Sequence, residues 1–479
     1  MNGYEKYISP LSERYAGKDM QYLFSQEHKF RTWRRLWVAL AESEQELGLD
    51  ISNEQIEELR AHQDDINYAD AELREREVRH DVMSHIYAYG LQCPKAAPII
   101  HLGATSCYVG DNTDIIIMRE GLEQIKKGII NTLSLLSDFA DKYMSQPALA
   151  FTHFQPAQPT TVGKRATLWM QDLVMDLEDA EHVSSELRLL GCKGTTGTQA
   201  SFLELFSGDH EKCVRLDQLI AEKMGFAGCV PVSGQTYSRK TDTRVLSVLA
   251  GTAQSAHKFS NDLRLLQHLK EIEEPFEKNQ VGSSAMAYKR NPMRSERMAG
   301  LCNFVMSNVQ NAYMTGATQW FERTLDDSSN RRLSIAEGFL ATDGILRLYR
   351  NIVDGLVVYP KVIEKHLEAE LPFMATENIL MDAVKAGGDR QKLHERIRQY
   401  SMEAGRLIKE EGQPNILLEL IAADPGFDLD ADKLKARMKP SDYVGRASRQ
   451  TADYLESEIR PLLERYSHYL VKDTEDIEV

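Results

Sequence analysis

The sequence predicts an all-α protein in which three helical domains are built around a central bundle of long helices. Apolar residues keep helical spacing for some thirty residues from Thr113 to Tyr143, and four later segments repeat this pattern. The row from Ile115 to Met118 is apolar without a break, so this helix is apolar around much of its circumference and must be buried. We find no internal repeat and no convincing run of strands. These observations favour a bundle that crosses between subunits.

The N-terminal hundred residues predict a compact helical domain. Apolar residues from Phe30 to Leu47 fall on one helical stripe, and Gly48 is the expected end of this helix. Ser52 and Gln55 form a capping-box pattern that opens another helix. Long helices are expected at 113–143, 161–190, 240–270, 292–318 and 330–355. The expected domains are an N-terminal helical domain at 1–105, the central bundle at 106–358 with a catalytic loop at 281–292, and a C-terminal helical domain at 359–479.

Composition narrows the class of protein. The 479 residues carry 57 basic and 72 acidic side chains, a net charge of -15, which argues against binding to nucleic acid. No apolar run is long enough to span a membrane, and the N-terminus lacks the features of a secretory signal. The six cysteines form no C-x-x-C pair and the histidines form no H-E-x-x-H motif. We therefore expect a cytoplasmic protein that requires no metal or other cofactor.

The segment from Val281 to Met298 carries the strongest chemical signal. It holds four cations against one acid, a local charge of +3 within an acidic chain. Asn291 and Pro292 read as an N-cap followed by the first residue of a helix. The positive end of that helix then faces a Gly-Ser-Ser loop, a geometry that suits a small anionic ligand. On charge alone, a solvated basic helix start is the favoured interpretation, but the paired serines and Asn291-Pro292 favour a binding site.

Three other segments carry candidate functional groups. Thr105 and Ser106 lie in a turn before the first long helix, where hydroxyls bind a carboxylate or simply cap the helix. His153 lies in a proline-rich loop that can aim an imidazole, although a lone histidine is more often structural. In Arg79-His80-Asp81 the acid can orient His80, unless the three form only a charged surface. The glycine-rich turn at 191–199 matches neither phosphate-binding fingerprint.

Together these segments resemble the fumarase/aspartase superfamily. Its three separated conserved regions look like G-A-T-S-C at 103–107, T-H-F-Q-P-A-Q-P-T-T at 152–161 and G-S-S-A-M-A-Y-K-R-N-P at 282–292. Within the superfamily the sequence is most similar to the adenylosuccinate lyases, in particular their animal-type branch. That likeness rests on S-P-L-S-E-R-Y at 9–15, R-H-D-V-M at 79–83, K-G-T-T-G-T-Q-A-S-F at 193–202, W-F-E-R-T-L-D-D-S-S-N-R-R at 320–332, L-P-F-M-A-T-E-N at 371–378 and G-R-A-S at 445–448.

The resemblance implies an all-α homotetramer whose central bundle comes from all four subunits and whose active sites are shared between subunits. It implies β-elimination of fumarate from adenylosuccinate, giving AMP, and from SAICAR, giving AICAR. Ser283 is the implied general base, His153 the general acid, and His80 assists substrate binding. Lys289, Asn291, Thr105 and Ser106 are suited to stabilise the charge that develops on a carboxylate. The further matches to nucleotide-binding positions are Arg14, Tyr15, Arg79, Asp81, Gln235, Arg297, Arg323, Ser328 and Arg332.

One position departs from the family pattern, because Ala287 stands where the family loop usually has proline. Argininosuccinate lyase, or another fumarate-releasing lyase, would share the superfamily motifs, but the arginine-rich segment at 320–332 favours a phosphorylated nucleotide as substrate. A non-catalytic structural protein on the same fold is the alternative from another class. Retention of Ser283, His153 and Lys289 together argues against it.

Overall fold

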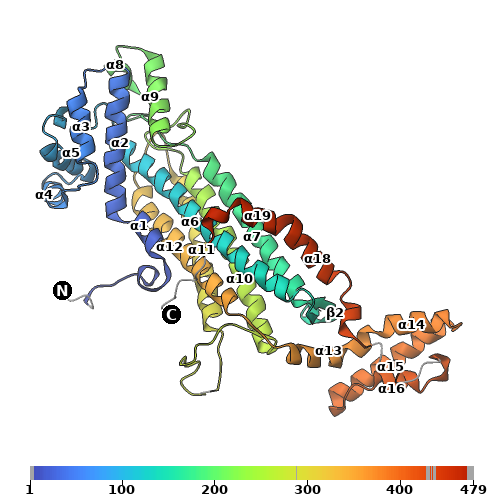
Figure 1. Ribbon diagram of the computed structural model, residues 1–479. Helices are drawn as coiled ribbons and strands as arrows, with labels where there is room; N and C mark the ends of the chain where they lie inside the picture. The colour runs from blue at the N-terminus through green and yellow to red at the C-terminus, as the bar shows by residue number, and fades with distance from the viewer. Residues whose placement is uncertain (1–4, 287, 428–431, 433, 435–437, 472–479) are drawn as a thin grey trace.

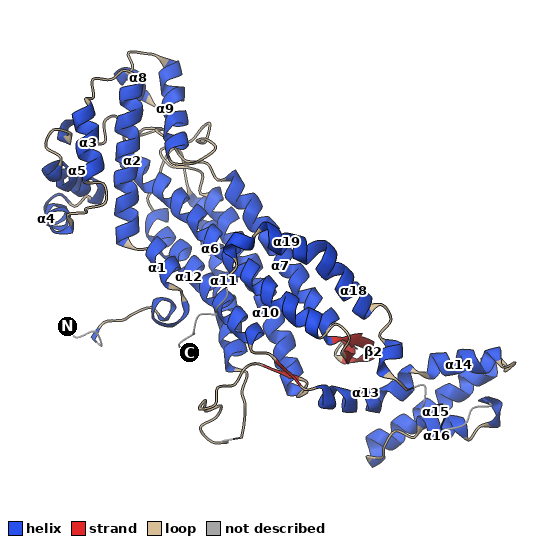
Figure 2. Ribbon diagram, in the orientation of Figure 1, coloured by secondary structure: helices blue, strands red, loops and turns tan. Residues whose placement is uncertain are grey.

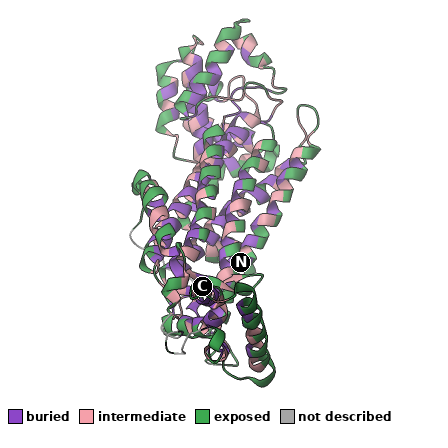
Figure 3. Cartoon of the chain, turned by 90° about the vertical axis from the view of Figure 1, so that its right-hand side faces the viewer, coloured by how far each residue is buried: buried purple, intermediate pink, exposed green. Residues whose placement is uncertain are grey.

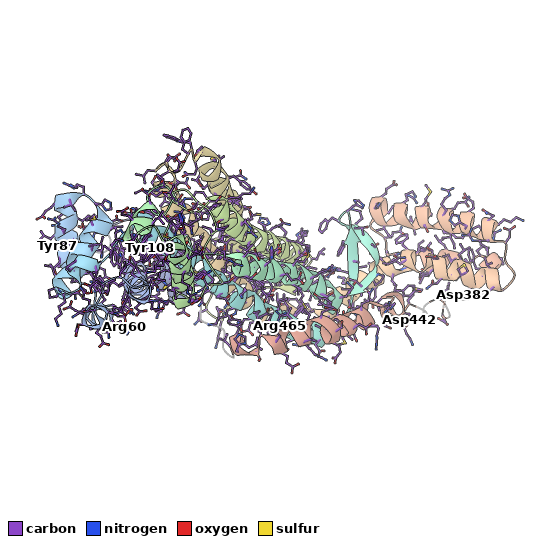
Figure 4. The ribbon with its side chains drawn as sticks, turned by 90° about the horizontal axis from the view of Figure 1, so that it is seen from above. Arg60, Tyr87, Tyr108, Asp382, Asp442 and Arg465 are labelled. Carbon is purple, nitrogen blue, oxygen red and sulfur yellow. The ribbon has the colours of Figure 1, made fainter. Side chains whose placement is uncertain are left out.

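The structure is a computed structural model that describes residues 5–286, 288–427, 432, 434 and 438–471. Within these residues helices dominate, and the strands form two small antiparallel pairs (Figure 2). The predicted all-α class is confirmed. The N-terminal helices and the C-terminal helices α14 to α16 lie at opposite ends of a long molecule, as seen from above in Figure 4, where Tyr87 and Asp382 mark the two ends.

Five long helices form the central bundle and lie side by side in Figure 1. They are α6 (Ser106–Lys142), α7 (Val162–Glu186), α10 (Lys240–His268), α11 (Met293–Thr318) and α12 (Asp327–Asp354). All five were predicted, but α6 begins at Ser106 rather than near Thr113. Its first two turns contain buried polar side chains: Asn112, for example, donates to the carbonyl oxygen of Tyr108 on the same helix (2.7 Å) and exchanges two hydrogen bonds with the backbone of Gly191 (3.0 and 3.3 Å). The sequence predicted a turn here because several of the first residues of α6 are polar, although they belong to the helix.

The core runs along the axis of this bundle, as the buried residues in Figure 3 show. Ile115, Ile116, Ile117 and Met118 are all buried, although they point in different directions around α6. Helices of the same chain already cover them. Close approach of α6 to the start of α7 requires a glycine at 163, because a Cβ there would lie only 2.5 Å from the carbonyl oxygen of Ala140.

The N-terminal part consists of short helices around α2. Trp33, Trp37 and Leu40 of α2 are buried, Gly48 ends the segment with a φ of 94°, and Ser52 and Gln55 form the predicted capping box. The elements are η2 (Leu11–Tyr15), α1 (Lys18–Leu23), α2 (Gln26–Glu46), α3 (Asn53–Ala61), α4 (Tyr68–Val78), α5 (Asp81–Gln92) and η3 (Ala97–Ile99), with α8 (Ala200–Leu205) and α9 (His210–Lys223) beside them.

Two strand pairs replace segments that were expected to be loops or helix ends. Strands β1 (Pro147–Thr152) and β2 (Gln155–Thr161) form an antiparallel hairpin with an irregularity after Leu149, and β3 (Ile272–Glu273) pairs with β4 (Val357–Val358). The expectation of a proline-rigid loop around His153 is therefore wrong. Proline lacks the N–H that a ladder uses, but a two-stranded pair leaves one side of each strand unpaired, so Pro156 and Pro159 are tolerated in β2.

The C-terminal part divides its side chains between two cores. Helices α14 to α16 share a separate core with Phe427 and Leu434, while α18 and α19 return along α6 and α7 and join the main core (Figure 1). The domain boundaries drawn above stay a prediction. The elements are α13 (Pro360–Met374), α14 (Thr376–Lys385), α15 (Arg390–Glu411), α16 (Leu417–Ala422), η4 (Pro425–Phe427), η5 (Pro440–Tyr443), α18 (Ala447–Tyr454), η6 (Leu455–Ile459), α19 (Arg460–Arg465) and η7 (Ser467–Tyr469).

Candidate active site

A cavity of about 440 Å³ lies where the starts of α2, α5, α6 and α12 meet. Five residues predicted from the sequence line it: Asp81, Ser106, Arg323, Ser328 and Arg332. The stretch around Ser328 is helical, so Ser328 and Arg332 are one turn apart on α12, as their spacing required. The cavity therefore brings together candidates from three distant parts of the sequence.

His80 stands at the edge of this cluster. It is the N-cap of α5, where its Nδ1 accepts a weak hydrogen bond from the amide of Met83 at 3.4 Å, and its Nε2 lies 3.3 Å from Ser106 Oγ. Asp81 Oδ1 is 3.8 Å from His80 Nδ1, and Asp81 Oδ2 is 3.9 Å from Arg332. The predicted proximity of His80 and Asp81 is present, but the distance is too long for a hydrogen bond that would orient the imidazole.

One wall of the cavity is formed by a buried network of arginines and aspartates that the sequence did not reveal. Arg239 pairs with Asp111 (2.9 Å) and Asp327 (2.6 Å), and Arg331 pairs with Asp242 (2.6 Å). Burial by itself lowers the pKa of Arg239, but Asp111 reverses this effect and the net pKa lies above the ordinary value. These buried ion pairs hold the wall of the cavity in place.

Some of the missed residues left a signal in the sequence. Arg331 stands beside Arg332 in a predicted motif, but it is buried in the network, whereas Arg332 is exposed to the cavity mouth. Asp111 and Asp114 are three residues apart on α6, which places both on one face. Lys29 also lines the cavity, but it lies next to the apolar stripe of α2, from which the sequence predicts only a buried helix face.

Ser283 lies in the loop between α10 and α11, which extends from the far end of the bundle in Figure 1. Its Oγ accepts hydrogen bonds from the backbone amides of Ala285 (3.3 Å) and Met286 (3.1 Å). Two amides that point at one hydroxyl oxygen stabilise negative charge on it. Ser283 is half-buried, while Lys289 is exposed. Ala287, the position that departs from the family pattern, lies outside the described residues.

The helix after this loop starts differently from the prediction. Pro292, not Asn291, is the N-cap of α11, and Met293 is its first residue. Asn291 instead donates to the carbonyl oxygen of Gly282 at 2.7 Å and closes the base of the loop. The predicted capping role of Asn291 is therefore wrong.

The positive end of α11 is also occupied by the protein itself. The buried carboxylate of Glu274 accepts from the amides of Arg294 (3.0 Å) and Ser295 (2.9 Å) and from Ser295 Oγ (2.8 Å). Arg294 pairs with Glu277 at 2.7 Å. The first turn of α11 therefore binds an internal carboxylate, which corrects the expectation that it is open to a small anion. Of the other predicted cations, Arg297 is half-buried on α11.

His153 lies at the tip of the β1–β2 hairpin and is exposed. His153 and Phe154 both have positive φ, 53° and 57°, so the two residues of the turn adopt the left-handed conformation that glycine or asparagine normally supplies. Such a backbone costs free energy and is concentrated at functional sites. Among the described residues the imidazole has no hydrogen-bond partner, and Figure 1 shows the hairpin at the end of the bundle opposite α2.

The remaining candidates are placed apart from the cavity or at its border. Arg14 and Tyr15 lie in η2, where Tyr15 contacts Gly344 and its carbonyl oxygen accepts from Arg347 at 3.1 Å. The amide of Gln235 donates to the carbonyl oxygen of Glu322 at 3.0 Å, next to Arg323. Arg79, with a φ of 58°, ends α4 and is exposed, and Thr105 precedes α6 without a side-chain capping bond. One chain therefore does not assemble all the candidates at one place.

Among the described residues, no group of three or more histidine, cysteine, aspartate or glutamate side chains is arranged to hold a metal ion. No helix in the described part of the chain is long and apolar enough to cross a membrane.

The glycine-rich turn at 191–199 packs against other parts of the protein. A Cβ on Gly191 would collide with Asp217, and one on Gly197 would collide with the backbone of Ser233.

Comparison with solved structures supports the fold. A 3-carboxy-cis,cis-muconate lactonizing enzyme from Pseudomonas putida superposes with a TM-score of 0.80 at 21% identity, over 94% of this chain and 99% of that one. A fumarate lyase from Mesorhizobium superposes with a TM-score of 0.79 at 20% identity, over 95% and 100%. At this level of identity the likeness concerns the fold alone.

Comparison by sequence is more specific. A family model described as lyase matches residues 22–307, and one described as adenylosuccinate lyase C-terminus matches residues 372–454. The adenylosuccinate lyase of Schizosaccharomyces pombe is 49% identical over the whole of both chains, that of Saccharomyces cerevisiae is 50% identical over 98% of each, and that of Schistosoma mansoni is 44% identical over 98% of each. The chain therefore belongs to the adenylosuccinate lyase family.

Proposed function

We propose that this chain cleaves adenylosuccinate to AMP and fumarate, and SAICAR to AICAR and fumarate, by β-elimination. The observation that carries the proposal is the similarity to curated adenylosuccinate lyases along the full length of the chain. Both substrates are phosphorylated ribotides with a succinyl group, and the cation-lined cavity between α2, α6 and α12 suits such an anion. The reaction requires no metal or other cofactor in this proposal.

The first step removes a proton from the carbon next to a carboxylate. Ser283 is the proposed base, and an ordinary serine hydroxyl is far too weak a base at neutral pH. The two amides that donate to Ser283 Oγ support this role, because they favour the alkoxide over the neutral hydroxyl. In this proposal the ammonium of Lys289 stabilises the negative charge that develops on the substrate carboxylate, and Asn291 keeps the loop closed through Gly282.

The second step protonates the nitrogen that leaves with the nucleotide. His153 is the proposed acid, and its exposed position at the hairpin tip leaves the imidazole free to meet a substrate. In one chain the hairpin, the Ser283 loop and the cavity occupy separate places. We therefore propose that each active site combines these parts from different subunits of a homotetramer. Exposed apolar side chains along two bundle helices, Leu168 and Met175 on α7 and Phe304 and Met314 on α11, support such an assembly.

The proposal also includes a cytoplasmic location. All six cysteines are free thiols in the structure, as expected for a protein kept in a reducing compartment.

An ultraviolet assay of the purified protein tests the reaction. Adenylosuccinate, SAICAR and argininosuccinate are supplied separately, as is fumarate with ammonia, and Ser283→Ala serves as the control for a contaminating lyase. We expect turnover of adenylosuccinate and SAICAR only. Turnover of argininosuccinate with no activity on adenylosuccinate would overturn the proposal.

Mixing two inactive variants tests the shared site. Tetramers of His153→Ala and of Ser283→Ala carry complementary defects if the two residues of each site come from different chains. Gentle dissociation, mixing and reassembly should then restore a fraction of wild-type activity, because a symmetric mixed tetramer contains some intact sites. Either variant reassembled alone should stay inactive. Verified mixed tetramers without activity would show that each site lies within one chain.

A further inference from the structure

The cations that line the cavity differ in how they are paired. Four of them are arginines, and each lies between 2.6 and 3.9 Å from an aspartate. The fifth is Lys29. Among the residues that the structure describes, no carboxylate lies within ion-pair distance of its ammonium group. Three of the arginines, Arg239, Arg323 and Arg331, already form short ion pairs within the wall of the cavity. Lys29 is therefore a cation that can pair with a bound anion.

Two aromatic rings hold the Lys29 side chain in place. Its Nζ lies 4.8 Å from the centre of the Trp33 ring and 5.2 Å from that of Phe30, both on α2. Burial lowers the pKa of Lys29; Asp81 and Asp114 oppose this effect, and Arg332 adds to it. A half-buried ammonium that is partly removed from water and lacks an anion is costly, and a bound anion offsets that cost.

The neighbours of Lys29 indicate which anion fits. Ser328 is the second residue of α12, so its hydroxyl lies at the positive end of a long helix. Arg332 is one turn further along and makes only a long contact, 3.9 Å, with Asp81. An ammonium, a guanidinium and a hydroxyl beside a helix N-terminus together match a phosphate group, which has three acceptor oxygens and two negative charges.

We propose that Lys29 binds the 5′-phosphate of the nucleotide substrate together with Arg332 and Ser328. This inference rests on the proposed function, because it assumes a ribotide substrate. The succinyl carboxylates are the less suitable partners, since they must reach the Ser283 loop where the proton is removed. Lys29 therefore contributes to affinity for both substrates, which share the phosphate, and makes no contact with the reacting atoms.

Steady-state kinetics of Lys29→Met and Lys29→Arg test the inference, with Lys142→Met as the matched control. Lys142 also lies near an aromatic ring, 5.0 Å from the centre of Tyr143, but does not line the cavity. We expect Lys29→Met to raise KM for adenylosuccinate by about 10- to 100-fold, the usual effect of losing a hydrogen bond to a charged group. The kcat should stay within about threefold of wild type, since the loss is one of ground-state binding. Lys29→Arg should recover most of the affinity.

A substrate analogue without the 5′-phosphate identifies the group that Lys29 contacts. Wild type and Lys29→Met should cleave this analogue with equal kcat/KM, and inorganic phosphate should inhibit the variant less than wild type. An unchanged KM, a loss confined to kcat, or an equal loss of kcat/KM on adenylosuccinate and on the analogue without the 5′-phosphate would each overturn the inference. If Lys29→Met fails to fold, Lys29→Gln gives the same comparison. Wild-type protein that does not cleave adenylosuccinate contradicts the proposed function, whereas active wild type with an unaffected Lys29 variant contradicts this inference alone.

Discussion

Glu44 offers a prediction that depends only on burial and proton linkage. It lies on α2, is fully buried, and neither carboxylate oxygen has a hydrogen-bond partner among the described residues. Burial raises its pKa from the ordinary value of 4.5 to about 9. At neutral pH the folded protein therefore holds this group as a neutral acid, whereas the unfolded chain holds it as a carboxylate.

The sign of the pH effect follows from these two values. Well below pH 4.5 the group is protonated in both the folded and the unfolded state, so it does not change the free energy of unfolding with pH. As pH rises from there towards 9, the unfolded state gains stability by releasing the proton, so the free energy of unfolding falls. The slope for a single such group is about 1.4 kcal/mol per pH unit. Between about pH 5.5 and about pH 7.5 the loss amounts to roughly 2 to 3 kcal/mol.

The variant Glu44→Gln removes the titration and keeps the shape of the side chain. We expect it to gain stability relative to wild type by that roughly 2 to 3 kcal/mol when pH is raised over the same interval, whatever constant cost the buried amide adds. Urea unfolding followed by tryptophan fluorescence, at fixed protein concentration, measures the difference. Glu57→Gln is the control, because Glu57 is exposed on α3. Parallel pH profiles for wild type and Glu44→Gln would refute the reasoning.

Three further predictions concern the site and its supports. Ser283→Ala and His153→Ala should each lower kcat by roughly 100- to 10,000-fold with an unchanged circular dichroism spectrum, and near wild-type turnover in either would show that the residue is not the acid or base. Glu274→Gln should destabilise the protein by about 1 to 3 kcal/mol in chemical denaturation, because an amide nitrogen cannot accept from the second backbone amide, and unchanged stability would contradict this capping role. Gly163→Ala should lower the free energy of unfolding by about 1 to 3 kcal/mol or more, because the new Cβ would meet backbone atoms. Gly405→Ala, whose Cβ would meet no atom, should raise it by about 0.5 to 1 kcal/mol. Equal effects of the two substitutions would count against the packing argument.

The fold class and the five bundle helices could be predicted because helical periodicity is a local property that persists over many turns. The start of α6 could not, since Asn112 is a buried polar residue that exchanges hydrogen bonds with Gly191, a residue far away in the sequence. The hairpin around His153 was missed for a related reason. Prolines and a lone histidine carry no alternating pattern, and the pairing of β1 with β2 satisfies the backbone only in three dimensions.

The sequence predicted several residues of the candidate site, but not how these residues are arranged in space. Motif positions supplied Ser106, Ser328 and Arg332, and the structure places all three at one cavity. The motifs gave no means of separating Arg331 from Arg332, because only the ion pair of Arg331 with the buried Asp242 distinguishes them. Lys29 was overlooked because its neighbours on α2 form an apolar stripe, and an amphipathic pattern does not say which cavity a lysine at its edge will reach.

Rigid geometry along α12 provides an independent argument for a shared site. Tyr15 is fixed beside Gly344, while Ser328 lies at the start of the same helix, sixteen residues earlier. At 1.5 Å per residue the two positions are about 24 Å apart along the axis, more than a nucleotide phosphate can bridge. If Arg14 and Tyr15 bind the same phosphate group as Ser328 and Arg332, we therefore expect them to come from another copy of the chain. This separation along α12 is a physical reason for proposing that the site forms between subunits.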